Sequence, residues 1–191
     1  MLTIFGSGGL ARQIIDGVPP ASRFVTDAGG GDICGLPIER FDPGMGGELI
    51  IAVRDLPTRH RIAAQWAGDL GRYIDATAQV SRYAQIADGV IMCRNAVIEA
   101  EASLGRHCQA NIGAKIGHGS KIGDFSVVGP DALVCGDCTI GRDVYIGAGA
   151  IIREGTTVGD GAFIGMGSMI FRDVPPDARM VFGRARPQLA A

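Results

Sequence analysis

The segment Ile116-Gly-His-Gly-Ser-Lys-Ile-Gly-Asp-Phe-Ser-Val-Val128 contains the pattern that decides the fold, an apolar residue at every sixth position. The spacing runs without insertion from Ile74 to Ile170, and the small Ala110 is the weakest of its seventeen members. A helix of period 3.6 cannot keep a six-residue repeat on one face, whereas a short strand followed by a corner can. The repeat therefore predicts a parallel β-helix over residues 73–175.

Each six-residue unit is expected to form one short strand and one corner, so three units make a triangular coil. The large aliphatic side chain points into the axis, and the residue four positions later, which is small or β-branched, fits the corner. Glycine often follows the aliphatic residue and permits the backbone angles of a tight corner. Coils stacked at the spacing of hydrogen-bonded strands would build a column about 27 Å tall.

Composition excludes several classes of function. The chain has 191 residues, a formal net charge of −2 and a pI near 5.9, so charge does not favour nucleic acid or a membrane surface as a partner. No apolar run approaches the ~20 residues that span a bilayer, and the first residues, MLTIFGSGG, carry no basic segment. We expect a soluble, cytoplasmic protein.

Four of the five cysteines occupy repeat positions that favour small residues, namely Cys93, Cys108, Cys135 and Cys138. Cys135 and Cys138 form a C-x-x-C pair, but no second cysteine pair or suitably spaced histidine accompanies it. The cysteines are therefore predicted to be small packing residues, and no metal is expected.

Residues 1–72 are predicted to form a small α/β domain, and residues 176–191 an extended tail. Strands are expected at 2–5, 24–26 and 48–53, with helices at 12–17 and 57–66 and loops at 27–32 and 42–47. Strands that alternate with helices indicate a small parallel sheet, here Rossmann-like. The domain is long enough for only one mononucleotide-binding half.

A glycine-rich turn joins the first strand to the first helix. Gly6, Ser7, Gly8 and Gly9 form it, and Asp27 follows about twenty residues later. This order is typical of nucleotide-binding folds, in which glycines let the backbone approach a phosphate. The motif favours a nucleotide sugar as ligand, with a dinucleotide or a purely structural turn as alternatives.

Three histidines are candidates for chemistry. His60 is expected on the solvated face of the second helix, and His107 is expected in a corner of the column as an ordinary exposed residue. His118 lies midway along the column between Gly117 and Gly119, which would let a ligand or a second chain come close.

The chain resembles the sugar O- and N-acyltransferases of bacterial glycan biosynthesis, which include sialic acid O-acetyltransferase and the UDP-4-amino-sugar N-acetyltransferases. The matching stretches are residues 4–12, Ile51-Ala52-Val53, the segment from Asn111 through His118 to Phe125, and Phe182-Gly183. The resemblance implies a left-handed column, a homotrimer and acetyl-CoA in the groove between adjacent columns. It also implies acetyl transfer to an amino or hydroxyl group of a nucleotide-linked sugar.

The resemblance assigns roles to particular residues. His118 would be the general base, Asn111 would place the acceptor, and a backbone N–H near Gly136 would stabilise the oxyanion. The nucleotide sugar would contact Gly6, Ser7, Gly8, Gly9, Asp27, Ala52, Val53 and Arg54. The acyl donor would contact Gly136, Gly165, Met166, Gly183 and Arg184.

The sequence also departs from the family pattern. The best-studied members have an acidic residue beside the catalytic histidine, which is flanked here by Gly117 and Gly119, and some members have a second histidine where this chain has Val127. Leu10 and Arg54 are further departures, and Phe182-Gly183-Arg184-Ala185 replaces the usual tail. Alternatives are O-acetylation of a free or polymeric sugar, acylation of an amino acid, a hexapeptide carbonic anhydrase, and a non-catalytic binding protein.

Overall fold

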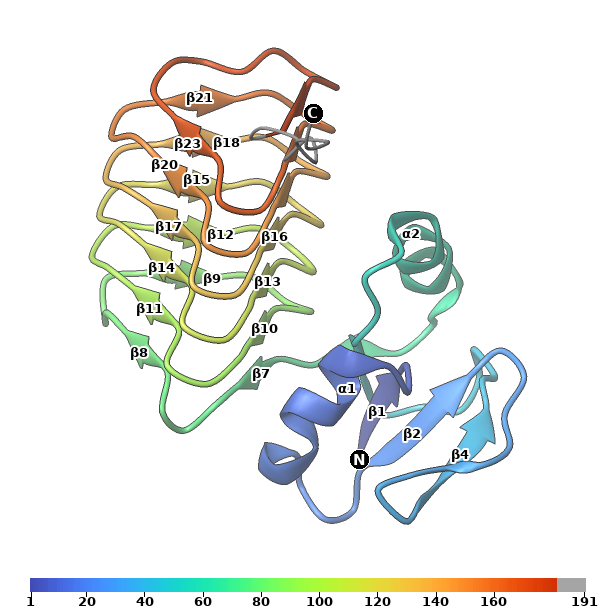
Figure 1. Cartoon of the computed structure of the whole chain (residues 1–191). Coiled ribbons are helices and arrows are strands. Elements are labelled where there is room, and N and C mark those ends of the chain that lie inside the picture. Colours follow the sequence, from blue (N-terminus) through green and yellow to red (C-terminus); the bar gives the residue numbers. More distant parts are fainter. Residues whose placement is uncertain (182–191) are drawn as a thin grey trace, which may run out of the picture.

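The protein has two parts, a column of stacked strands and a smaller α/β part beside its base (Figure 1). The computed structural model describes residues 1–181. No helix within these residues is long and apolar enough to cross a membrane.

Seventeen two-residue strands, β7 to β23, follow the six-residue spacing that the repeat predicts. Each strand pairs in parallel with the strand one coil away, as when Ile98 lies opposite Ile116. The β7 sheet contains β7 (Tyr73–Ile74), β10 (Ile91–Met92), β13 (Gln109–Ala110), β16 (Val127–Val128), β19 (Tyr145–Ile146), β22 (Phe163–Ile164) and β24 (Arg179–Met180). The β8 sheet contains β8 (Gln79–Val80), β11 (Val97–Ile98), β14 (Lys115–Ile116), β17 (Leu133–Val134), β20 (Ile151–Ile152) and β23 (Met169–Ile170). The β9 sheet contains β9 (Gln85–Ile86), β12 (Ser103–Leu104), β15 (Lys121–Ile122), β18 (Thr139–Ile140) and β21 (Thr157–Val158).

The axis of the column is one continuous apolar core. Repeat positions from Met92 to Ile170 are buried in it together with the small corner residues such as Ala96 and Ala114. Each fully buried aliphatic side chain stabilises the folded state by about 1.5–3 kcal/mol relative to an exposed one. Ile74, expected in this core, is 44% exposed because β7 is the first rung and no described coil closes the column beneath it.

The column continues beyond residue 175. Val174 forms a parallel bridge with Val158, and β24 pairs with β22 through residues 163–164. The first residues of the expected tail therefore add a last rung to the β7 sheet.

The α/β part is built on a sheet in the order β3-β4-β2-β1-β5-β6. Its strands are β1 (Leu2–Phe5), β2 (Arg23–Thr26), β3 (Asp32–Ile33), β4 (Leu36–Arg40), β5 (Glu48–Ile51) and β6 (Asp69–Leu70), parallel except for the β3–β4 pair. Its helices are α1 (Gly9–Ile14), the 3₁₀ turn η1 (Ile15–Gly17) and α2 (Leu56–Gln65). The prediction missed β3, β4 and β6, and α1 begins three residues earlier than expected.

Two sets of contacts attach this part to the column. The Gln109 amide donates to the carbonyls of Ile51 and Val53, at 3.1 Å each, and so holds the chain after β5 against β13. From α2, Arg59 is 1% exposed and donates to the carbonyls of His107 and Phe125.

His107 is therefore not the exposed residue that the sequence suggested, because α2 covers it. Its ring is 3% exposed and stacks on Phe125 at 4.7 Å, while the His60 ring stacks on Phe125 at 4.0 Å. His60 stays half-exposed, as expected, and its Nε2 lies 2.8 Å from Asp143 Oδ1. Burial, followed by the charge of Arg59, lowers the pKa of His107 to about 4.

Candidate active site

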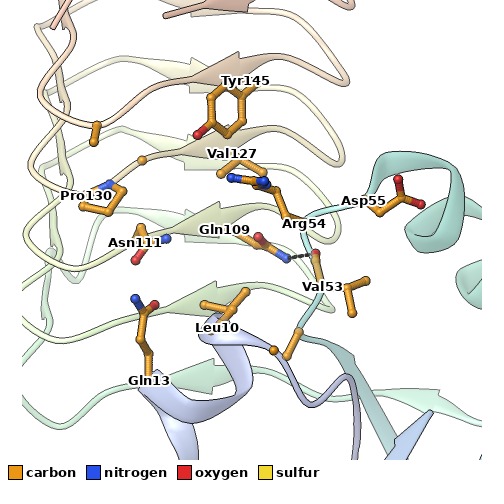
Figure 2. Close-up of a pocket in the computed structure, with 15 residues that line it drawn as sticks. Leu10, Gln13, Val53, Arg54, Asp55, Gln109, Asn111, Val127, Pro130 and Tyr145 are labelled. Carbon is orange, nitrogen blue, oxygen red and sulfur yellow. Dashed lines mark hydrogen bonds between the residues drawn. The ribbon is translucent and has the colours of Figure 1, made fainter. Parts of the chain in front are cut away.

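A pocket of about 640 Å³ lies where the α/β part meets the β7 sheet (Figure 2). One wall comes from the turn before α1 and from α1 itself, and a second comes from the chain that leaves β5. The third wall is formed by successive coils, through Asn111, Val127 and Tyr145. A pocket shared between two structural parts is a frequent location for ligands.

The pocket gathers five of the eight residues predicted to bind a nucleotide sugar, namely Gly8, Gly9, Ala52, Val53 and Arg54. A Cβ added at Gly8 or Gly9 would meet no atom of the described residues within 4 Å, so these residues leave the backbone open to a ligand.

The other three predicted residues, Gly6, Ser7 and Asp27, do not line this pocket. Gly6 has a structural role, because its φ is +129° and a Cβ would lie 2.7 Å from the Ala52 carbonyl oxygen. Asp27, expected to contact the nucleotide sugar, instead accepts a 2.6 Å hydrogen bond from Arg61 of α2.

The pocket has opposite charges at its rim. The exposed Arg54 side chain supplies a cation, and the adjacent Asp55 is the N-cap of α2. Hydrogen bonds from Thr58, one of them 3.0 Å from its backbone N–H, hold the pKa of Asp55 below its usual value. Asn111 accepts from the Ile112 N–H at 2.8 Å through its Oδ1, which leaves its amide nitrogen to donate to a ligand.

His118 lies outside this pocket. Asn111 and the pocket belong to the corner between the β7 and β8 sheets, whereas His118 lies at the next corner, between β14 and β15. Its side chain is 57% exposed, and its ring rests on Gly136, where an added Cβ would lie 2.5 Å from Nε2.

Two carboxylates from other coils approach His118. Its backbone N–H donates to Glu99 Oε2 at 3.0 Å, and its Nδ1 lies 3.8 Å from Asp137 Oδ2. Neither carboxylate is adjacent to His118 in sequence, but each is 19 residues away, about one coil of the repeat.

The residues predicted to hold the acyl donor divide between the same two corners. Gly136 lies with His118, while Gly165 and the 76% exposed Met166 follow β22 on the corner that carries Asn111. Gly183 and Arg184 lie outside the described residues.

The comparisons with known proteins agree with this architecture. Residues 137–172 match the model of a family described as bacterial transferase hexapeptide (six repeats). The acetyltransferase domain of PglB from Neisseria gonorrhoeae FA1090, solved with acetyl coenzyme A, aligns over 97% of this chain and 98% of its own at 27% identity and TM-score 0.87. The predicted resemblance to hexapeptide acyltransferases is confirmed.

Two further structures share the fold. A variant of perosamine N-acetyltransferase from Caulobacter crescentus, solved with CoA and GDP-perosamine, aligns over 95% of this chain and 93% of its own at 23% identity and TM-score 0.86. WeeI from Acinetobacter baumannii AYE aligns over 97% of this chain and 98% of its own at 22% identity and TM-score 0.83. At these identities the likeness shows the fold alone. Comparison with curated proteins found no match.

Together these findings support an acyltransferase, and the expected co-substrate, acetyl-CoA, is the molecule bound to the PglB domain.

Among residues 1–181, no group of three or more histidine, cysteine and acidic side chains could hold a metal ion. Burial raises the pKa of the Cys93 and Cys108 thiols to about 12, so neither thiol is prepared to act as a nucleophile.

The pocket also contains residues that were not predicted from the sequence, namely Gln13, Asp55, Gln109, Gly129, Pro130, Tyr145 and Ala148. A signal for some of them exists in the sequence. Residues 91, 109, 127 and 145 are 18 apart, so they stack on the outer face of the β7 sheet. Three of them are apolar or aromatic, which indicates a face that another part of the chain covers.

Proposed function

We propose that this protein transfers the acetyl group of acetyl-CoA to an amino group of a nucleotide-linked sugar. The observation that carries the proposal is the pocket between the glycine turn and the column, in a chain that aligns along 97% of its length with the PglB acetyltransferase domain. The pocket combines open backbone at Gly8 and Gly9, a cation at Arg54 and a donor at Asn111.

The acceptor fits this pocket in one orientation. The diphosphate of a nucleotide sugar would lie near the glycines and Arg54, because a guanidinium binds phosphate oxygens well. The sugar would then extend along the column toward Asn111. The apolar surfaces of Leu10 and Val127, which replace polar residues of the family pattern, favour a deoxy sugar at this end.

In the proposed reaction, Nε2 of His118 takes a proton from the acceptor amine as its nitrogen attacks the thioester carbonyl carbon. The carbonyl oxygen gains negative charge, which a backbone N–H near Gly136 would stabilise. The carbon–sulfur bond then breaks, and the CoA sulfur leaves and receives the proton. Assistance by a positioned histidine accelerates such a step by about 10²–10⁴-fold.

Because the pocket and His118 lie at different corners, we infer that the active site forms between chains of a homotrimer. The outward residues of the β8 sheet support this inference, since Leu133, Ile151 and Met169 are apolar and the last two are 36% and 53% exposed. A second column on this face would bring its pocket toward His118 and would unite the two groups of donor-binding residues. We also propose that the column is left-handed, that residues 1–72 are Rossmann-like and that the column begins at residue 73, while β24 moves its end beyond the expected residue 175.

The experiment measures release of the CoA thiol from acetyl-CoA with a panel of UDP-, GDP- and dTDP-linked amino sugars. We expect turnover with one amino sugar by the wild type and by Lys121→Ala, an exposed control on the strand after His118, but not by His118→Ala. If turnover occurred only with acceptors that offer a hydroxyl group, the reaction would be O-acetylation instead of N-acetylation. Binding of neither acetyl-CoA nor a nucleotide sugar would refute the enzyme and favour a binding protein.

A further inference from the structure

The two sequence neighbours of His118 are glycines, so neither supplies the acidic residue that many related enzymes have beside their histidine. At Gly117 a Cβ would lie 2.7 Å from the Cys135 carbonyl carbon and 2.7 Å from the Gly136 nitrogen. Gly119 has φ +66°, and a Cβ there would collide with Asp137 Oδ1. Gly117 therefore needs glycine for reasons of backbone packing, and at position 119 a side chain would compete with Asp137 for the same space. In this chain the carboxylate nearest the imidazole comes from another coil.

Asp137 is that carboxylate. Its backbone N–H donates to the His118 carbonyl at 2.7 Å, and its Oδ2 lies 3.8 Å from Nδ1. The ring rests on Gly136, whose missing side chain leaves the space that the imidazole fills. This arrangement turns Nδ1 toward the carboxylate and leaves Nε2 on the other edge of the ring.

We propose that Asp137 is the positioning residue of His118, holding the neutral imidazole with its proton on Nδ1 so that Nε2 is free to accept the acceptor's proton. The proposal rests on the proposed role of His118 as general base. The tautomer of a histidine is set by the group that faces its other nitrogen. A distance of 3.8 Å fits this role, because catalytic hydrogen bonds are often long before substrate binds.

The structural alternative is that Asp137 only shapes the corner, and the fold provides the comparison. Asp131, Asp137 and Asp177 all have positive φ, at 53°, 54° and 58°. Each places Oδ1 over a glycine of the preceding coil, Gly113, Gly119 or Gly161. Asp137 alone of the three has a histidine just before that glycine, since Ile112 and Asp160 take its place in the other two corners.

The test compares Asp137→Gly with the matched control Asp177→Gly, since glycine adopts positive φ without strain. Protein labelled with ¹⁵N-histidine is observed by NMR at about pH 9, where free imidazole is neutral, and three histidines give a simple spectrum. We expect the His118 proton on Nδ1 in the wild type and in Asp177→Gly, and mainly on Nε2 in Asp137→Gly.

Kinetics provide the second readout. We expect kcat of Asp137→Gly to fall about two- to fivefold, the effect of one exposed ion pair, with both KM values and all parameters of Asp177→Gly unchanged. An unchanged His118 tautomer in Asp137→Gly, or an equal change in Asp177→Gly, would overturn the proposal. Because NMR needs no turnover, a missing reaction would count against the proposed function alone. Asp137→Asn is a second variant, because asparagine also tolerates this backbone conformation.

Discussion

Acid should weaken the attachment between α2 and the column through one buried histidine. His107 is 3% exposed, its Nδ1 has no hydrogen-bond partner among residues 1–181, and the Arg59 guanidinium donates to its carbonyl. A proton on this ring would add a second buried cation beside Arg59. Burial therefore lowers the pKa of His107 from 6.5 to about 4.

The sign and size of the effect on stability follow from the difference between the pKa of His107 in the unfolded chain, 6.5, and in the folded chain, about 4. Above about pH 6.5 the folded and unfolded chains both hold neutral His107, so it contributes nothing to the pH dependence. As the pH falls from 6.5 toward 4, the unfolded chain takes up the proton first and is stabilised. Each pKa unit corresponds to about 1.4 kcal/mol, so the free energy of unfolding should fall by about 3 kcal/mol over this window.

The assay is denaturant unfolding at several pH values between 7 and 4, at one protein concentration, with His107→Asn as the comparison. Asparagine tolerates the φ of 57° at this corner and does not titrate. Other titrating groups are common to both proteins and cancel in the difference. The wild type should lose about 3 kcal/mol more than the variant between pH 7 and 4. Parallel losses in the two proteins would refute the reasoning.

Three further predictions concern the site. In Gly136→Ala, the new methyl group would displace the His118 ring, so kcat should fall at least about tenfold while the chain stays folded; unchanged steady-state kinetics would contradict this. Gln109→Leu removes both hydrogen bonds that hold the chain after β5, so the free energy of unfolding, measured with denaturant, should fall by about 2 kcal/mol. Arg54→Ala should raise KM for the nucleotide sugar about tenfold and leave KM for acetyl-CoA unchanged, and equal changes in both would show that Arg54 does not face the sugar nucleotide.

The sequence predicted the column almost strand for strand, from Ile74 onward. Each six-residue unit contains both the aliphatic residue that is buried and the small residues that form the corner, and equivalent units stack in a single register. Local information is therefore sufficient. The prediction was wrong at the two ends of the column. Ile74 is exposed there, and Met180 belongs to a further strand that does not follow the six-residue spacing.

The site could be predicted only in part. Gly8 and Gly9 line one pocket together with the loop at Ala52, Val53 and Arg54, because both segments follow parallel strands of one sheet and leave at the same edge. Asp27 follows the neighbouring strand but pairs with Arg61 of α2. That helix is distant in sequence, so no local pattern indicated the pairing.

By itself, the sequence determined a repeat whose period sets which side chains point inward and which residues stack one coil apart. Only the tertiary structure decided which outer face the α/β part covers, and hence that His107 is buried and Gln109 is bonded to the chain after β5. It also decided that the carboxylate beside His118 is Asp137 of the next coil. The physical reason is the same in each case, since these contacts join residues whose approach depends on the packing of whole segments and not on any local preference.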